Sequence, residues 1–185
     1  MLFLYLHGFN SSPNSVKAKK LNVFLKASYP ESKVVMPQLS VGPEKVLSSI
    51  DKILSEPGGQ KFLIGSSLGG LIARYLTETR EDIAGSILIK KIQYIEREQY
   101  HPELGRHYQI TNKHLDFVQR LTLVGSKNQS KYLLLCQKDD QECLWEESRE
   151  VLPEADFYLG EGQGHGFENI EVAFDHIQGF IDKFC

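Results

Sequence analysis

The chain has 185 residues, which is enough for one domain with a sizeable hydrophobic core. Its hydrophobic fraction of 41% and charged fraction of 24% are ordinary for a globular protein. A formal net charge of −3 argues against a general affinity for nucleic acid or for an anionic membrane surface. No apolar run approaches the roughly 20 residues that a membrane helix needs. We therefore expect a single domain spanning residues 1–185.

The three cysteines, Cys136, Cys143 and Cys185, are an odd number and lack CxxC spacing. This usage predicts free thiols in a reducing compartment, so we expect a cytoplasmic protein. No close pair among the cysteines and histidines has the spacing of zinc ligands. The sequence therefore predicts neither a metal nor a cofactor.

Short apolar segments alternate with helical patterns in the first half of the chain. Strands are expected at Leu2–His7, Lys33–Met36, Phe62–Gly65 and Ile83–Ile89, and helices at Val16–Ala27, Pro43–Leu54 and Gly69–Thr79. In the first of these helices, we expect an apolar stripe to face the core, formed by Val16, Val23, Phe24 and Ala27.

The pattern breaks at Lys90–Val124, which is charged and aromatic and is expected to contain no strand. We regard this segment (90–124) as a candidate lid or insertion. Its aromatic residues either line a binding pocket or anchor an irregular excursion to the core; they are Tyr94, Tyr100, Tyr108 and Phe117. Beyond it, strands are expected at Lys131–Gln137 and Ala155–Leu159, and helices at Leu144–Leu152 and Ile170–Phe184.

Six strands with interleaved helices predict an α/β fold. We expect a doubly wound, mainly parallel sheet of about six strands with helices on both faces, that is, a three-layer αβα sandwich. In such sheets the reactive groups gather where loops leave the carboxyl ends of the strands.

The strongest functional signal is Gly65-Ser66-Ser67-Leu68-Gly69, between an apolar strand and a helical pattern. A serine hydroxyl becomes a useful nucleophile only when it is held exposed beside a base. A sharp strand-to-helix turn holds it so, and the glycines on either side let the backbone make that turn. We predict that Ser67 is a nucleophile, and that Ser66 is a small residue that the turn tolerates.

An oxyanion hole requires two backbone N–H groups aimed at developing negative charge. The N–H of Leu68, at a helix N-terminus, is the first candidate. The second is the N–H of Phe9 in His7-Gly8-Phe9, at the end of the first strand. We expect the His7 side chain itself to cap the strand and hydrogen-bond the loop.

The general base is predicted to be His165, in the glycine-rich run Gly160–Phe167 between the last strand and the last helix. Such a loop can bring an imidazole over the sheet edge to the nucleophile. The other histidines lack this placement, because they lie in the charged segment or within the final helix.

The acid that orients His165 should follow the preceding strand, where Asp139 and Asp140 compete. We favour Asp140, because Cys143 and Leu144 follow it and can pin the loop to the core. The other aspartate is expected to be a solvated turn residue or a helix cap, and Glu142 is a remote third candidate.

The order Ser67, Asp140, His165 is the nucleophile–acid–base order of one hydrolase fold. Four features at the ends of successive strands form a stronger signal than the serine turn alone. The sequence therefore predicts a serine hydrolase.

Four segments resemble the YqiA-type esterases of the α/β-hydrolase superfamily. They are Leu4–Pro13, Met36–Leu39, Ile64–Gly70 and the Gly164-His165 loop. The resemblance implies an esterase or thioesterase that acts on acyl esters, acyl-CoA among them, with Ser67, His165 and an aspartate as the triad.

The sequence departs from this family pattern in two places. The run that carries the acid, Lys138–Leu144, has an extra residue, so Asp139 remains a possible triad acid beside Asp140. The segment after Ile89 lacks the Asn-Pro start of the family. The alternatives are a non-catalytic domain that binds a small molecule or protein in its cleft, and a hydrolase of amides or carbon–carbon bonds.

Overall fold

The computed structural model describes residues 1–9, 11–40, 42–91, 98–101 and 106–185. The strands are β1 (Leu2–Leu6), β2 (Lys33–Val35), β3 (Lys61–Ser67), β4 (Ile83–Lys91), β5 (Glu98–His101), β6 (Arg106–Gln109), β7 (Tyr132–Gln137) and β8 (Asp156–Gly160). The helices are α1 (Val16–Ser28), α2 (Pro43–Leu54), α3 (Leu68–Thr79), α4 (Asn112–Thr122), α5 (Trp145–Val151) and α6 (Phe174–Asp182), with 3₁₀ turns at Gln129–Lys131 and Ile170–Ala173.

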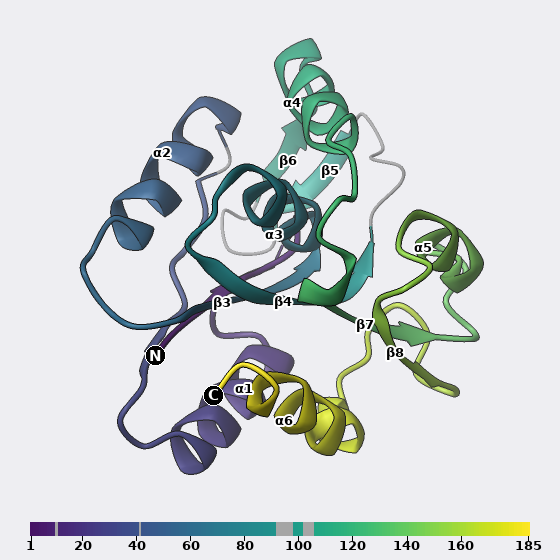
Figure 1. The fold of residues 1–185 in the computed structure, drawn as a ribbon. Helices are drawn as coiled ribbons and strands as arrows, with labels where there is room; N and C mark the ends of the chain where they lie inside the picture. Colours follow the sequence, from purple (N-terminus) through teal and green to yellow (C-terminus); the bar gives the residue numbers. More distant parts are fainter. Residues whose placement is uncertain (10, 41, 92–97, 102–105) are drawn as a thin grey trace.

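One six-stranded sheet organises the molecule, in the order β2-β1-β3-β4-β7-β8. All of its neighbouring strands pair in parallel. Helices α1 and α6 lie on one side of the sheet and α2, α3 and α4 on the other (Figure 1). The predicted doubly wound, three-layer α/β architecture is confirmed.

The side chains of each central strand alternate between two hydrophobic cores, as the period of a β-strand requires. In β1, Leu4 and Leu6 pack toward α2 and α3, whereas Phe3 and Tyr5 pack toward α1 and α6. All four are almost completely buried. Burial on both faces explains why the central strands read as continuous apolar runs rather than as alternating ones.

Helix α1 forms where it was predicted, but its predicted inner face is wrong. Val16 and Val23 are 48% and 69% exposed, and the buried residues are Lys17, Ala18, Leu21 and Leu25. The pattern was misread because a lysine occupies the inner face, where its ammonium group donates a hydrogen bond to Ser66 Oγ at 3.2 Å. A polar residue at position 17 argues against that face being buried. The apolar pattern therefore favours the face of Phe24 and the two valines, although both valines are exposed.

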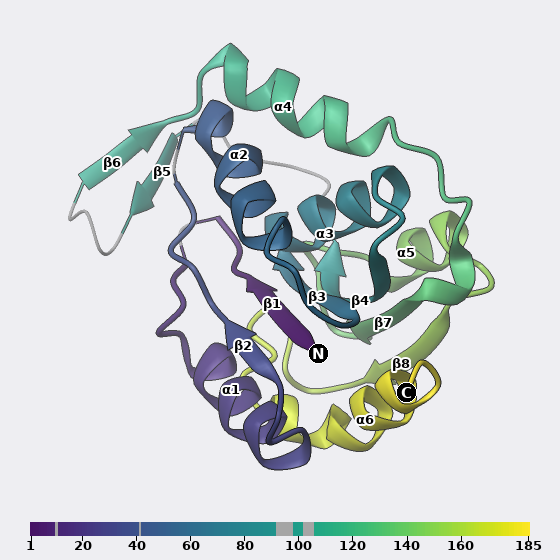
Figure 2. The same cartoon turned by 60° about the vertical axis from the view of Figure 1, so that its left-hand side comes forward.

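The expectation that Lys90–Val124 contains no strand is also wrong. Strands β5 and β6 pair with each other in antiparallel fashion, outside the main sheet, and form a hairpin beside α2 and α4 (Figure 2). These strands are short and polar, so no apolar run in the sequence predicts them. Helix α4 follows, with His114, Phe117 and Leu121 buried and a capping box at Thr111.

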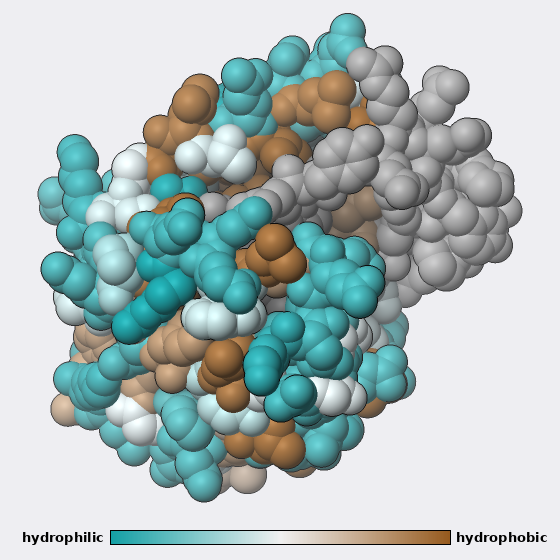
Figure 3. Space-filling model, turned by 90° about the vertical axis from the view of Figure 1, so that its right-hand side faces the viewer, coloured by the Kyte–Doolittle hydropathy of each residue, from teal (hydrophilic) through white to brown (hydrophobic). Residues whose placement is uncertain are grey.

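The outer surface beside β8 and α5 is mainly hydrophilic, with apolar residues in separate small patches (Figure 3). Leu144 and Leu159 are among the exposed apolar residues of the molecule. Single exposed apolar side chains of this kind are ordinary on protein surfaces. Within the described residues, no helix has both the length and the apolar character needed to cross a membrane.

The two faces of α1 predict opposite effects of truncation. Leu21→Ala removes a completely buried side chain and should lower the free energy of unfolding by about 2–5 kcal/mol. Val23→Ala, on the exposed face of the same helix, should change it by less than about 0.5 kcal/mol. Urea denaturation followed by circular dichroism measures both, and equal effects would contradict this orientation of α1.

Candidate active site

The turn between β3 and α3 holds Ser67 in an unusual backbone conformation. Its φ is +56° and its ψ is −122°, a combination that residues other than glycine rarely adopt. Such a conformation costs on the order of 1–3 kcal/mol and persists only where surrounding contacts enforce it. It is the sharp strand-to-helix turn that the sequence motif predicts.

Crowded backbone on both sides explains why glycines flank this turn. A Cβ atom on Gly65 would lie 2.3 Å from the carbonyl oxygen of Gly69, and one on Gly69 would lie 2.0 Å from that of Leu6. Both distances are far shorter than any real contact, and the blocking atoms belong to the backbone. Only glycine allows β1, β3 and α3 to approach this closely.

A buried polar network supports the turn from the α1 side of the sheet. Ser66 accepts the hydrogen bond from Lys17, whose side chain is almost fully buried, and Ser66 also interacts with the Tyr5 hydroxyl. Burial raises the pKa of Tyr5 to about 12, although hydrogen bonds with Ser15 and Ser66 act in the opposite direction. Ser66 is therefore more than the tolerated small residue that the sequence suggested.

The loop after β1 lies directly against Ser67. Leu6 pairs with Gly65 at the ends of their strands, and a Cβ on Gly8 would be 3.1 Å from Ser67 Cβ. The absence of that atom lets the loop approach the serine. Phe9 and Leu68, the two predicted oxyanion donors, line one small pocket beside it. As the first residue of α3, Leu68 has an N–H that the helix leaves unused.

His7 has the structural role expected of it. Its Nε2 accepts a hydrogen bond from the Leu39 N–H at 2.9 Å, so Nδ1 carries the proton and donates to the Gly8 carbonyl at 2.8 Å. The ring therefore ties the loop after β2 to the loop that bears Phe9. Because both ring nitrogens are engaged, His7 is not available as a base.

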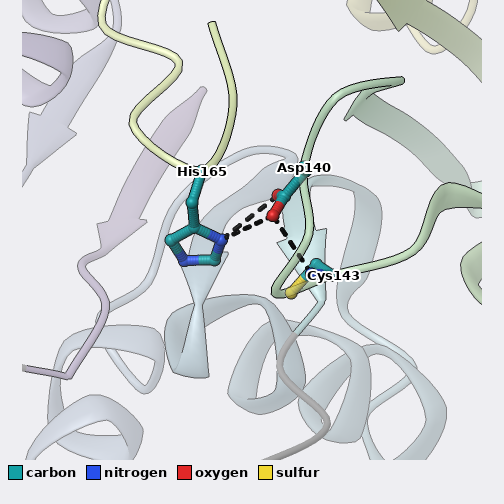
Figure 4. A group of neighbouring side chains, drawn as sticks. All are labelled: Asp140, Cys143 and His165. Atoms are coloured by element: carbon teal, nitrogen blue, oxygen red, sulfur yellow. Dashed lines mark hydrogen bonds and ion pairs between the residues drawn. The ribbon is translucent and has the colours of Figure 1, made fainter.

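Asp140 and His165 meet at the same edge of the sheet, as Figure 4 shows. His165 Nδ1 lies 3.1 Å from each carboxylate oxygen of Asp140. The aspartate side chain is 1% exposed and the histidine side chain 30%. Because an ionised carboxylate only accepts hydrogen bonds, Nδ1 is the donor, which leaves Nε2 of the neutral ring as the acceptor that a general base requires.

Backbone N–H groups fix Asp140 in turn. Its Oδ1 accepts from the N–H of Glu142 at 3.0 Å and from that of Cys143 at 3.1 Å. Cys143 is buried and pins the turn after β7 to the core, whereas Leu144, the other residue expected to do so, is 49% exposed. These contacts hold the carboxylate in place before it orients His165.

Asp139 has a different set of contacts. It is exposed, and it accepts hydrogen bonds from the backbone N–H groups of Gly162 and Gly164, both at 2.9 Å. Desolvation raises the pKa of Asp139, but the hydrogen bonds from Gly164 and Gly162 outweigh it and hold the pKa below its ordinary value. The expectation of a solvated turn residue was therefore incomplete, because Asp139 anchors the loop that carries His165.

The nitrogen of His165 that would serve Ser67 has a carboxylate nearby. Glu142 Oε2 lies 3.6 Å from His165 Nε2, and the Glu142 side chain is 73% exposed. Among the hydrogen bonds of the described residues, none joins Ser67 to His165. Catalytic hydrogen bonds are often long before substrate binds and tighten in the complex.

The same cluster includes potential metal ligands. The ligand atoms of Asp140, Cys143 and His165 lie within 4.8 Å of one another, and all three residue types bind zinc. However, both carboxylate oxygens already interact with His165 Nδ1. A metal ion would have to break this hydrogen-bonded pair, so the contacts favour the acid–base interpretation.

Similar solved structures identify the fold. The match to mouse alpha/beta hydrolase domain-containing protein 10 has 18% sequence identity and a TM-score of 0.75. It covers 100% of this chain and 90% of the mouse chain. Est1E of Butyrivibrio proteoclasticus, solved with ferulic acid, is 14% identical (99% and 88% covered, TM-score 0.75). The monoacylglycerol lipase of Paleococcus ferrophilus is 16% identical (97% and 94% covered, TM-score 0.69).

The fold is that of the α/β-hydrolase superfamily, as the resemblance of the sequence implied. Within it, residues 2–182 match the model of an uncharacterised protein family, UPF0227, and the chain belongs to that family.

The crowding around Ser67 makes Gly69→Ala a test of the turn. The added methyl group would collide with the Leu6 carbonyl, and because backbone must move, we expect a loss of about 3 kcal/mol or more in the free energy of unfolding. Gly179→Ala is the matched control. Nothing lies within 4 Å of a Cβ on Gly179 in α6, so alanine should stabilise the protein by about 0.5–1 kcal/mol. Thermal denaturation of both variants measures the contrast.

Proposed function

We propose that this protein is a serine esterase or thioesterase that cleaves acyl esters through an acyl-enzyme intermediate. The observation that carries the proposal is the strained Ser67 at the carboxyl end of β3, on the sheet edge where the Asp140–His165 pair follows β7 and β8. The hydrolase superfamily of the chain and the esterases and lipase among its structural neighbours support it.

In this mechanism, His165 Nε2 takes the proton of Ser67 as the serine oxygen attacks the carbonyl carbon. Asp140 keeps the ring in the required tautomer and stabilises the imidazolium that forms. The N–H groups of Phe9 and Leu68 hold the oxyanion, where the loss of one such donor typically costs on the order of 3 kcal/mol. The intermediate collapses to the acyl-enzyme as the protonated His165 gives its proton to the departing alcohol or thiol, which leaves the ring neutral. The neutral His165 then takes a proton from water as the water oxygen attacks the acyl-enzyme, and this proton passes to Ser67 as the acid leaves.

An apolar pocket supports an acyl substrate. It begins at Phe9 and Leu68, so a carbonyl held by these N–H groups would place its chain inside. Val46 of α2 and Phe117 and Val118 of α4 form its walls. The pocket offers a free volume of only about 30 Å³, so it favours short acyl chains.

The segment 90–124 thus contributes to this proposed pocket through α4. Phe117 is the member of the expected aromatic set that lines it. Tyr94 lies outside the described residues, and only the backbone of Tyr100 and Tyr108 is described. We propose a small-molecule acyl ester or thioester as the partner, with no nucleic acid and no membrane surface, and the free cysteines support a reducing, cytoplasmic compartment.

A fluorophosphonate probe tests the enzymatic proposal, because it reacts with serines that a base activates. We expect the wild-type protein to be labelled at a single site and Ser67→Ala to be unlabelled. Ser48→Ala, at an exposed serine of α2, is the matched control and should retain labelling. A wild-type protein that stays unlabelled would favour the alternative of a non-catalytic binding domain, and label that persists in Ser67→Ala would place the activated serine elsewhere in the chain.

The pocket predicts a dependence on acyl-chain length. Among p-nitrophenyl esters, kcat/KM should be highest for short chains, and Val118→Trp should shift the optimum to still shorter ones because indole fills the pocket. Leu123→Trp, 77% exposed just after the same helix, should leave the optimum unchanged. Assays of the same acyl group as an ester, a CoA thioester and an amide then define the bond that is cleaved.

A further inference from the structure

The loop that carries His165 has a backbone that few sequences would adopt unaided. Three of its residues have positive φ: Gly162 at +88°, Gly164 at +46° and Phe167 at +42°. For Phe167 this left-handed conformation is unfavourable in itself. The loop therefore needs fixed points, and the position of the His165 ring depends on them.

One fixed point lies after His165 in the chain. Phe167 is completely buried, its ring stacks on Tyr158 with centroids 6.2 Å apart, and its N–H donates to the Gln163 carbonyl at 3.2 Å. Gln163 Oε1 also accepts from the Asn169 N–H at 2.8 Å. These contacts hold the end of the loop.

The second fixed point is the carboxylate of Asp139. Oδ1 binds the N–H of Gly162 and Oδ2 binds the N–H of Gly164, so each oxygen holds one amide. Neighbouring N–H groups in a backbone with left-handed residues form a concavity that binds anions. Here the protein supplies the anion itself, from a turn 23 and 25 residues away in the sequence.

The two neighbouring aspartates thus hold two different parts of the His165 region, the side chain and the backbone. Asp140 is buried and binds the imidazole, whereas Asp139 is exposed and binds the backbone directly before it. Because Gly164 precedes His165, movement of this peptide would swing the ring relative to Ser67. A misplacement of about 1 Å in a catalytic group costs on the order of 100-fold in rate.

We propose that Asp139 is a positioning residue for the general base. Its carboxylate holds the peptides of Gly162 and Gly164, and this places the His165 ring where it can contact both Asp140 and Ser67. This role rests on the proposed hydrolase function. Asp139, which competes with Asp140 in the sequence, thus has a role that is separate from that of the triad acid and from the bond cleaved.

The test compares Asp139→Ala and Asp139→Asn with the wild type. Alanine removes both acceptors, and asparagine keeps one oxygen but turns an amide group toward the other N–H. We expect kcat for a p-nitrophenyl ester to fall about 10- to 100-fold in Asp139→Ala and less in Asp139→Asn, with KM within about two-fold. The rate of fluorophosphonate labelling should fall in the same proportion.

Glu161→Gln is the matched control, because it removes a negative charge from the same exposed loop at a residue for which the structure shows no hydrogen bond or ion pair. It should retain kcat within two-fold. Asp140→Asn should lose about 10⁴-fold, as loss of the orienting carboxylate does in related triads. If Asp139→Ala keeps wild-type kcat, or loses no more than Glu161→Gln, Asp139 has no positioning role.

Amide hydrogen exchange provides a readout that is independent of turnover. The N–H groups of Gly162 and Gly164 should exchange at least ten-fold faster in Asp139→Ala, whereas the amides of β7 should keep their protection. Unchanged exchange at these two glycines would overturn the proposal even if activity fell. A wild-type protein without labelling or esterase activity would instead contradict the proposed function, while faster exchange at the two glycines would still demonstrate the anchor.

Discussion

The close approach of β1 to the start of α3 is the constraint on which the site depends. At Gly69 there is no room for a side chain beside the Leu6 carbonyl, so the backbone of β1 fixes the position of the turn and of the first residues of α3. That arrangement forces Ser67 into its left-handed conformation and brings Gly8 against it. The strain is therefore maintained by packing of the whole central sheet, and few local contacts of the serine are needed to hold it.

Much of this architecture could be predicted from the sequence, because parallel strands buried on both faces leave strong apolar runs. The six main-sheet strands lie within a few residues of their predicted bounds, and α2 matches them throughout. The pairing of Asp140 with His165 was also anticipated, since each follows a strand that ends at the same sheet edge. In each case a local pattern was sufficient.

The features that sequence reasoning missed depend on contacts between distant residues. Lys17 lies on the inner face of α1 because its partner is Ser66 in the nucleophile turn, and no periodicity reveals such a partner. Asp139 looks like an ordinary turn residue until the loop of Gly162 and Gly164 folds over it. Among the described residues, β5 and β6 pair with each other and with no strand of the main sheet, so they need no apolar run. The capping box at Thr111 uses His114 in place of the usual Glu or Gln, so the sequence carried no ordinary capping-box signal for α4.

The chain order of the sheet has a consequence for synthesis. The first 91 residues supply β1 to β4, and with them the proposed nucleophile and both proposed oxyanion donors. The proposed acid and base come from the turns after β7 and β8, in the second half of the chain. A serine hydroxyl without its base is a poor nucleophile. A nascent chain that has folded only its leading strands would thus present the proposed nucleophile without the base that activates it, until the last strand docks.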